Sequence, residues 1–252
     1  MEIRILGPVR VVTEGRTDNA LGGSKQRTVL AALLLAGGKV VPDARLSRLL
    51  WEDRPPTTAT AQLHTYASRI RRNLDGAVAL VRIRSGYQLD AGSVGSDLSR
   101  FRQLSGEGHR ALRAGDFGGA ARDLRAALAQ WRGEALADAS EQLAATERPQ
   151  LEERRLEAEE ALIEAGLCLG QHRRLVADLT ALVAQHPLRE RFRAQLMTAL
   201  YRSDRQSEAL TTYVDGRRLL AEHMGVEPGR LLSRTHQAVL SGDAALRHRL
   251  AS

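Results

Sequence analysis

The chain has 252 residues, of which 43% are hydrophobic, so it can form one large domain or two modest ones with real cores. Its single cysteine excludes an internal disulfide, and no apolar stretch approaches the roughly 18 residues of a membrane span. The formal charge of +7 is uneven, because residues 1–95 carry 14 Lys and Arg against 8 Asp and Glu, whereas the remainder carries 23 against 22. A local basic excess of this kind favours a nucleic-acid partner.

The N-terminal stretch predicts a small sheet followed by two helices. Ile3 and Ile5 alternate with polar residues, and a turn is expected at Glu14-Gly15, which indicates an antiparallel sheet. A first helix follows and ends at Gly37-Gly38. A second helix begins at Pro42-Asp43, and its inward side chains are expected to be Leu46, Leu49, Leu50 and Trp51.

The stretch after Pro55-Pro56 predicts a third helix, Thr58–Leu74, with two unlike faces. At about 100° per residue, one apolar face points inward and comprises Leu63, Tyr66, Ala67, Ile70 and Leu74. The opposite face has no acid and comprises Thr58, Ala61, Thr65, Ser68, Arg69 and Arg72. His64 and Arg71 flank it on one side and Gln62 on the other. Hydroxyl and guanidinium groups suit base edges and phosphates in a major groove.

Two short β-branched runs, Leu80–Arg84 and Tyr87–Leu89, come next and are expected to join at Ser85-Gly86. They predict a hairpin in which Arg82 and Arg84 alternate onto one side of their strand. A groove-sized helix followed by a basic hairpin is the outline of a winged helix. The alternative is a solvated, arginine-rich helix beside any small sheet, because runs of surface arginine are common.

After a linker at Ala91–Gly95, the pattern is almost wholly helical. The expected helices are Asp97–Ala114, Asp116–Trp131, Thr146–Leu169, His172–Gln185, Glu190–Ser203, Arg205–His223 and Pro228–Leu240. Gly170 and Asp204 are 34 residues apart, the length of one tetratricopeptide repeat. Stacked helical hairpins of that type are therefore predicted, with a plain helical bundle as the alternative. Such hairpins usually serve protein–protein contact.

No pattern of catalytic or metal-binding residues is present in the sequence. A G-x-G-x-x-A match, Gly106 to Ala111, lies inside a helical run and lacks the strand and sharp turn of a dinucleotide site. The seven histidines show no metal-ligand spacing. Cys168 is expected to be a small core residue, and the acidic run Glu152–Glu160 a solvated helix face. The sequence thus indicates a protein that is not an enzyme and needs no cofactor.

Blocks along nearly the whole chain resemble one family, and their spacing is as specific as their content. They are IRILGPVRV, GGSKQRTVLAALLL, LSRLLWEDRPP, LHTYASRIRRNL, SGYQL, WRGEALAD, LVAQHPLRERFRAQLMTALYRSDRQSEAL and LLAEHMGVEPG. The chain is similar to the Streptomyces antibiotic regulatory protein family, whose members join an OmpR-like winged helix to a bacterial transcriptional activator domain.

The resemblance implies a mainly α fold with a small α+β N-terminal domain. A winged helix-turn-helix is expected at residues 1–92, an all-α tetratricopeptide-like activator domain at 96–242, and a C-terminal tail at 243–252. Larger relatives carry a nucleotide-hydrolysing module after the activator domain, so the end of this chain suggests the small form. The start of the chain lacks the basic segment and cleavage site of a signal peptide, which fits a cytoplasmic, nucleoid-associated protein with no membrane partner.

The resemblance also implies a transcriptional activator of the kind that switches on a secondary-metabolite biosynthetic cluster. Its expected partners are tandem direct repeats of double-stranded DNA, bound as a homodimer, and RNA polymerase holoenzyme including its sigma factor. The recognition helix is Thr58–Leu74 and the wing Ala79–Leu89. The predicted DNA contacts are Lys25, Arg27, Thr58, Gln62, His64, Thr65, Ser68, Arg69, Arg71, Arg72, Arg82 and Arg84. The predicted polymerase contacts are Trp51, Glu52, Asp53 and Arg54. The competing hypothesis is a helical-repeat scaffold whose basic domain docks elsewhere.

Overall fold

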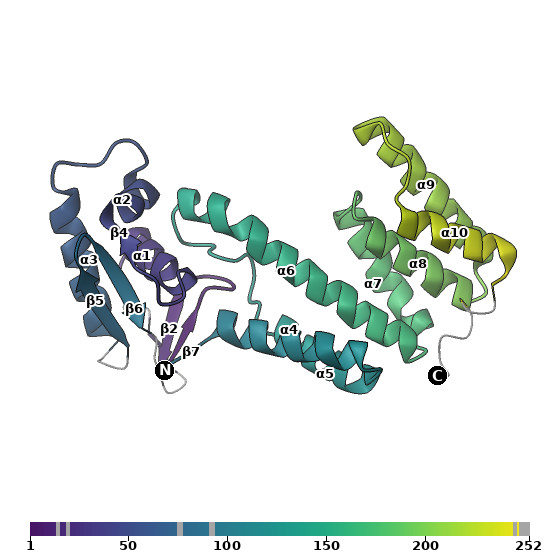
Figure 1. Cartoon of the computed structure of the whole chain (residues 1–252), viewed down its shortest axis with the longest axis horizontal. Helices are drawn as coiled ribbons and strands as arrows, with labels where there is room; N and C mark the ends of the chain where they lie inside the picture. Colours follow the sequence, from purple (N-terminus) through teal and green to yellow (C-terminus); the bar gives the residue numbers. More distant parts are fainter. Residues whose placement is uncertain (14–15, 19–20, 75–77, 91–93, 244–245, 247–252) are drawn as a thin grey trace. The chain divides into compact units, whose positions relative to one another are not determined.

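The computed structural model describes residues 1–13, 16–18, 21–74, 78–90, 94–243 and 246 (Figure 1). Its strands are β1 Glu2–Arg4, β2 Arg10–Thr13, β3 Arg16–Asp18, β4 Val41–Pro42, β5 Ala79–Ile83, β6 Gly86–Asp90 and β7 Gly95–Ser96. Its helices are α1 Ser24–Leu35, α2 Asp43–Trp51, α3 Ala59–Asn73, α4 Asp97–Arg113, α5 Phe117–Leu128, α6 Glu141–Cys168, α7 His172–Gln185, α8 Glu190–Arg202, α9 Gln206–Met224 and α10 Arg230–Ser241.

The described residues form two compact units. The first comprises Met1–Ser105 with Ala126–Leu156, and the second comprises Gly106–Arg125 with Glu157–Ser252. Each of α4, α5 and α6 therefore contributes residues to both units. The domain boundaries expected from the sequence, at residues 92, 96 and 242, stay a prediction.

The first unit contains two small sheets. One has the strand order β3-β2-β1-β7 and the other β4-β6-β5. The predicted antiparallel pairing at the N-terminus is confirmed, with Ile3 opposite Val11 and both side chains buried. The parallel partner of β1 was not predicted, because β7 has only two residues and Gly95 read as part of a linker.

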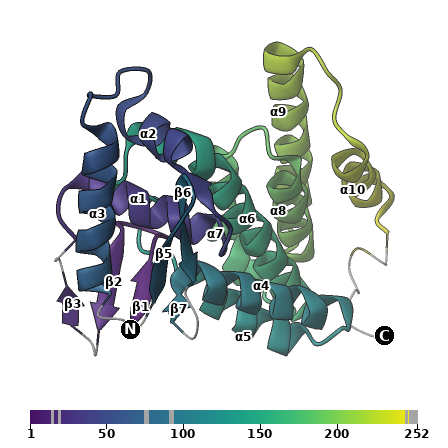
Figure 2. The ribbon, with the colours of Figure 1, turned by 60° about the vertical axis from the view of Figure 1, so that its left-hand side comes forward.

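Three helices follow the predicted order in the first unit, between the N-terminal strands and the final hairpin (Figure 2). α1 packs against α2, α3 and β6 through a nearly continuous run of buried residues, Val29 to Leu33. α3 buries Leu63, Ala67, Ile70 and the following Leu74, so its predicted inner face is confirmed except for Tyr66, which is half-buried. The helix–helix–hairpin arrangement presents the outer face of α3 to solvent.

Two helix predictions in the second half were wrong in part. α6 begins at Glu141, where Ser140 Oγ accepts the Leu143 N–H at 3.3 Å and caps the helix, whereas the prediction began at Thr146. The acidic run ending at Glu160 is not wholly solvated. Glu160 is buried because Arg189 and Arg191 form ion pairs with its carboxylate.

The second unit repeats one type of helix-to-helix turn. Gly115, Gly170 and Asp204 follow successive first helices, and all have positive φ, at 79°, 74° and 62°. In each turn the next N–H donates to the carbonyl five residues earlier, at 2.9–3.0 Å. This is the Schellman geometry, so the hairpins predicted from the repeat spacing end their first helices in the same way. α8 then packs against α7, α9 and α10.

Some sequence predictions fall outside the described residues. They are the hairpin turn at Glu14-Gly15, the helix break at Asp75-Gly76, most of the Ala91–Gly95 linker, and most of the tail at 243–252.

Candidate nucleic-acid interface

The outer face of α3 is polar, basic and accessible. The side chains at Thr58, Ala61, Thr65, Ser68, Arg69 and Arg72 are all exposed, as the helical period predicts. The helix contains no acid, and its last turn carries Arg71 and Arg72. Thr58 precedes the helix, but its hydroxyl accepts from Gln62 Nε2 at 3.0 Å and does not cap the backbone.

Arg69 and Arg72 are the cations of this face that remain available. Neither guanidinium forms an ion pair with any acid in the described part of the chain. Their side chains rise from positions 69 and 72, one turn apart on the helix, so both can reach the same nucleic-acid groove. Planar guanidinium forks bind a guanine edge or a phosphate with two hydrogen bonds.

The three residues that flank the face make contacts within the protein. Arg71 Nε donates to the Leu80 carbonyl of β5 at 2.7 Å, which joins α3 to the hairpin. His64 Nδ1 lies 3.1 Å from the Tyr87 hydroxyl, and Gln62 Oε1 accepts from the Tyr66 hydroxyl at 3.1 Å. His64 and Arg71 remain exposed, so their assignment to DNA stays a prediction.

The hairpin differs from its prediction. The turn consists of Arg84 and Ser85, and Gly86 is already the first residue of β6. Arg84 therefore lies in the turn, at φ 50°, and the expected alternation of Arg82 and Arg84 along one strand was wrong. A side chain added at Gly86 would meet the Val41 carbonyl oxygen at 2.7 Å, so the approach of β4 requires glycine here and shifts the turn back by one residue.

The Arg82 side chain is held by contacts within the protein. Its two terminal nitrogens donate to the two Asp43 carboxylate oxygens at 2.7 and 2.6 Å, and its guanidinium carbon lies 4.6 Å from the centre of the Tyr87 ring. The hydrogen bonds to Asp43 raise the pKa of Arg82. Asp43 begins α2, so this pair joins the second helix to the wing and leaves Arg84 as the exposed cation of the turn.

The two predicted contacts on α1 are placed differently. Lys25 is exposed in the first turn, with its ammonium 5.0 Å from the centre of the Trp51 ring. Trp51 is half-buried, so its predicted role as a core anchor was wrong in part: the indole also supports Lys25 by a cation–π contact. Arg27 is half-buried, and its Nη1 lies 3.2 Å from a carboxylate oxygen of Asp138.

The α2–α3 loop presents three charged side chains. Glu52, Asp53 and Arg54 are exposed and form no ion pair within the described residues. Glu52 has φ 56° and its N–H donates to the Arg48 carbonyl at 2.9 Å, while the Arg54 N–H donates to the Trp51 carbonyl at 3.0 Å. The backbone of the loop is therefore tied to the end of α2 and its side chains are left free.

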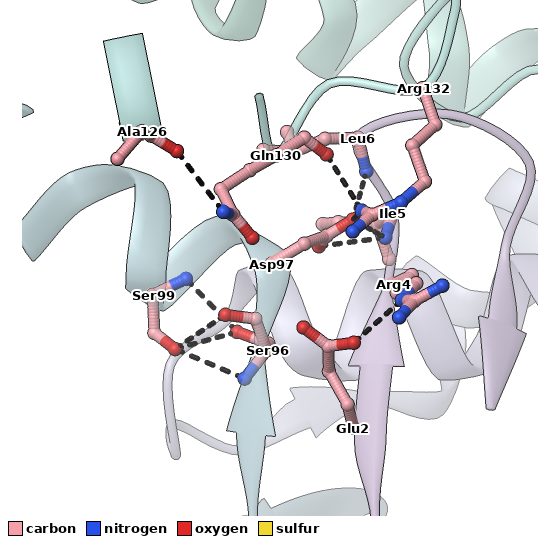
Figure 3. A network of polar contacts seen from close by, with 10 residues as sticks. All are labelled: Glu2, Arg4, Ile5, Leu6, Ser96, Asp97, Ser99, Ala126, Gln130 and Arg132. Carbon is pink, nitrogen blue, oxygen red and sulfur yellow. Dashed lines mark hydrogen bonds and ion pairs between the residues drawn. The ribbon is translucent and has the colours of Figure 1, made fainter. Parts of the chain in front are cut away.

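Asp97 was missed by sequence reasoning and organises the polar contacts beneath β1 (Figure 3). It accepts the Ile5 N–H at 2.9 and 3.0 Å and the Leu6 N–H at 2.9 Å, and Arg132 Nη1 lies 3.9 Å away. Burial raises the pKa of Asp97 from 3.8 to about 6, against the lowering effect of these hydrogen bonds. In the sequence, Asp97 is visible only as an acid at the start of a helix. That position does not reveal its hydrogen-bond partners Ile5 and Leu6, which lie 92 and 91 residues away.

Comparison with known proteins identifies the family. The bacterial transcriptional activator domain matches residues 96–240. The regulatory protein DnrI of Streptomyces peucetius is 36% identical, over 98% of this chain and 94% of its own length. The chain belongs to the Streptomyces antibiotic regulatory protein family. The regulatory protein AfsR of Streptomyces coelicolor is 45% identical over 96% of this chain, but the chain spans only 24% of AfsR.

A solved structure shares the fold of this family member. Mycobacterium tuberculosis EmbR, in complex with a low-affinity phosphopeptide, matches with a TM-score of 0.90 and 35% identity over 96% of this chain and 65% of EmbR. This likeness confirms the predicted winged helix-turn-helix followed by an all-α domain. Among the described helices, none is long and apolar enough to cross a membrane.

Proposed function

We propose that the chain is a sequence-specific DNA-binding transcriptional activator. The observation that carries the proposal is the acid-free, exposed face of α3, where Arg69 and Arg72 form no ion pair with a described acid. The activator domain assigned to residues 96–240 and the regulatory relatives support the same function. α3 enters a major groove, Lys25 and Arg84 contact phosphates beside it, and the other predicted residues on this face complete the interface.

The proposal extends to the assembly on a promoter. Two copies of the chain occupy tandem direct repeats, and the side chains of Glu52, Asp53 and Arg54 contact RNA polymerase holoenzyme, including its sigma factor. These side chains are exposed and form no ion pair with a described residue, which supports this role, and Trp51 holds one end of the loop. The regulated genes belong to a secondary-metabolite cluster.

The test is a footprint of the full chain on a promoter fragment from the neighbouring genes. We expect protection of repeated half-sites that persists against excess unrelated duplex and weakens with rising salt. Fragments with one and two repeats then test the assembly, because two copies that contact each other should bind two repeats cooperatively at spacings of whole helical turns. Binding that unrelated duplex abolishes would reject the activator in favour of a helical-repeat scaffold.

A further inference from the structure

Residues 132–140, between α5 and α6, belong to the first compact unit and run against the strand β1 and its continuation. The Arg132 N–H donates to the Leu6 carbonyl at 2.7 Å, and the Leu136 N–H donates to the Ile5 carbonyl at 3.0 Å. The Ala137 N–H completes the series with the Gly7 carbonyl at 3.4 Å. Segment 132–140 thus supplies hydrogen-bond donors to carbonyls of the chain that connects β1 to β2.

The contact is buried and closely fitted. Ile5 and Leu6 on one side and Leu136 on the other have no exposed surface. Leu136 has φ 59°, an unfavourable conformation for a branched side chain, so the surrounding contacts hold it there. A side chain added at Gly7 would lie 3.1 Å from the Arg132 carbonyl oxygen. Removal of segment 132–140 would therefore expose apolar surface and leave buried backbone carbonyls without donors.

Asp138 is the charged centre of the contact. Its carboxylate accepts the Val9 N–H at 2.7 Å and Arg10 Nη1 at 2.5 Å, and Arg27 Nη1 lies 3.2 Å away. Arg27 Nε is buried and has no hydrogen-bond partner among the described residues, and Asp138 is the acid that lies within ion-pair distance of this guanidinium there. One carboxylate therefore joins β2 to α1.

A second contact from segment 132–140 reaches α1 at Thr28, the residue after Arg27. The Ser140 N–H donates to Thr28 Oγ1 at 2.7 Å, and that hydroxyl donates to the Ser24 carbonyl at 2.9 Å. Thr28 is fully buried, so its hydroxyl has both of its hydrogen bonds satisfied within the protein. α1 in turn packs against α3 and carries Lys25 in its exposed first turn.

We propose that Asp138 is a positioning residue for the DNA interface, which holds α1 against β2 in the orientation that α3 needs to read a groove. The inference rests on the proposed function. It assigns part of sequence recognition to a residue that lies within the span of the activator domain and touches no DNA. Segment 132–140 is therefore a structural component of the DNA-binding unit and not merely the connection between α5 and α6.

A positioning role and a long-range charge effect of Asp138 predict opposite changes in DNA affinity when its charge is removed. Asp138→Asn removes a negative charge from a DNA-binding unit, and by long-range attraction alone the variant should bind every duplex slightly more tightly. Loss of positioning has the opposite effect, because Arg27 loses its counter-ion and α1 is released. Binding to the correct sequence then falls, while binding to unrelated sequence does not.

The experiment uses the full chain with two duplexes of equal length, the footprinted operator fragment and a scrambled sequence. Asp138→Asn is compared with Glu141→Gln, which removes the same charge three residues away. Glu141 is exposed and forms no ion pair with a described residue. We expect Asp138→Asn to weaken operator binding by about tenfold with scrambled binding unchanged or stronger, and Glu141→Gln to leave the ratio of the two affinities unaltered.

Binding is measured well below the thermal midpoint of each variant, so that the folded fraction does not limit the result. If Asp138→Asn does not fold, Thr28→Val decides. It leaves Asp138 intact but removes the acceptor of the Ser140 N–H, together with the hydrogen bond within α1 to the Ser24 carbonyl, and should also lower the ratio of operator to scrambled affinity. Equal ratios in wild type, Asp138→Asn and Thr28→Val would overturn the inference. A wild-type chain that does not distinguish the duplexes would instead reject the proposed function.

Discussion

The arginines of α3 and those of α1, β2 and β5 lie in the same compact unit but have different surroundings. Arg69 and Arg72 form no ion pair with a described acid, whereas Arg10 and Arg27 contact Asp138, and Arg82 contacts Asp43. The acids come from distant parts of the chain: Asp138 lies 128 residues from Arg10, and Asp43 lies 39 residues from Arg82. The charge of a segment therefore does not identify its binding residues, because the fold decides which cations acquire an acid.

The unpaired arginines provide the largest test of this difference. The double variant Arg69→Ala with Arg72→Ala should lose about 1–3 kcal/mol of operator binding free energy for each guanidinium that reads a base, with no loss of folding stability. If both hold phosphates, all sequences should weaken alike and the salt slope should shrink by about two. Fluorescence anisotropy of labelled operator, measured across a salt series, gives both quantities.

A matched control is Arg100→Ala, which removes an exposed cation of α4 that forms no ion pair with a described acid. It should change operator affinity little. Wild-type affinity and salt slope in the double variant would remove α3 from the interface.

The paired and unpaired arginines of the hairpin should respond in opposite ways. Arg82→Ala breaks a bidentate pair with a half-buried Asp43 and should lower the free energy of unfolding by about 1–2 kcal/mol. Arg84→Ala should leave stability unchanged and reduce the salt slope of DNA binding by about one. Urea unfolding and anisotropy distinguish the two variants. A stability loss in Arg84→Ala equal to that in Arg82→Ala would contradict the assignment.

Much of the fold could be predicted from the sequence, because local periodicity and turn residues report on local structure. The inner face of α3 and the positive-φ turns at Gly115, Gly170 and Asp204 are of this kind. The parallel pairing of β7 with β1 could not be predicted, because two residues carry no periodicity. The start of α6 was missed, since the prediction began at Thr146 and did not use Ser140, whose hydroxyl accepts the Leu143 N–H and caps the helix.

Of the candidate interface, the sequence could predict the exposed positions of α3 but not which basic side chains are held within the protein. Arg71 donates to a carbonyl of β5, and Arg82 is held by the first residue of α2. Both contacts depend on how the helices and the hairpin pack. Single-sequence patterns describe one element at a time, so they placed Arg71 by helical period and Arg82 by strand alternation without these contacts. The assignment of both residues to DNA stays a prediction.

Asp97 differs from the exposed acids of the molecule because its side chain is buried. This burial raises the pKa of its carboxyl to about 6. In the unfolded chain the carboxyl loses its proton near its ordinary value of 3.8, so between these two values the folded state binds more protons. The stabilisation that this group contributes is present below the lower value and is lost as pH rises through about 6. Its share should be about 1 kcal/mol smaller at pH ~7.5 than at pH ~5.

Carbon-detected NMR of the Asp97 carboxyl checks this expectation directly, through a titration midpoint near 6. Urea unfolding of wild type and Asp97→Asn at both pH values supplies the energetic check, because the variant cannot titrate at this position. The difference in stability between wild type and variant should narrow as pH rises. A midpoint near the ordinary value would show that the hydrogen bonds from Ile5 and Leu6 outweigh burial.

The α2–α3 loop adds a third group to the comparison of charged residues: charges that are neither paired within the described part of the fold nor part of the outer face of α3. Asp53 and Arg54 are exposed and form no ion pair with a described residue, and the backbone on either side of them is fixed by hydrogen bonds. A charge reversal at Asp53 should therefore leave stability and operator affinity near wild type. If the loop contacts polymerase, transcription from a purified promoter and holoenzyme should fall several-fold at full operator occupancy.

Arg48→Ala, at an exposed site on α2 before the loop, serves as the control for a general change in surface charge. Should transcription follow occupancy in every loop variant, the loop is a connector only, and the polymerase contact must be sought on the wing or on the helices of the second unit.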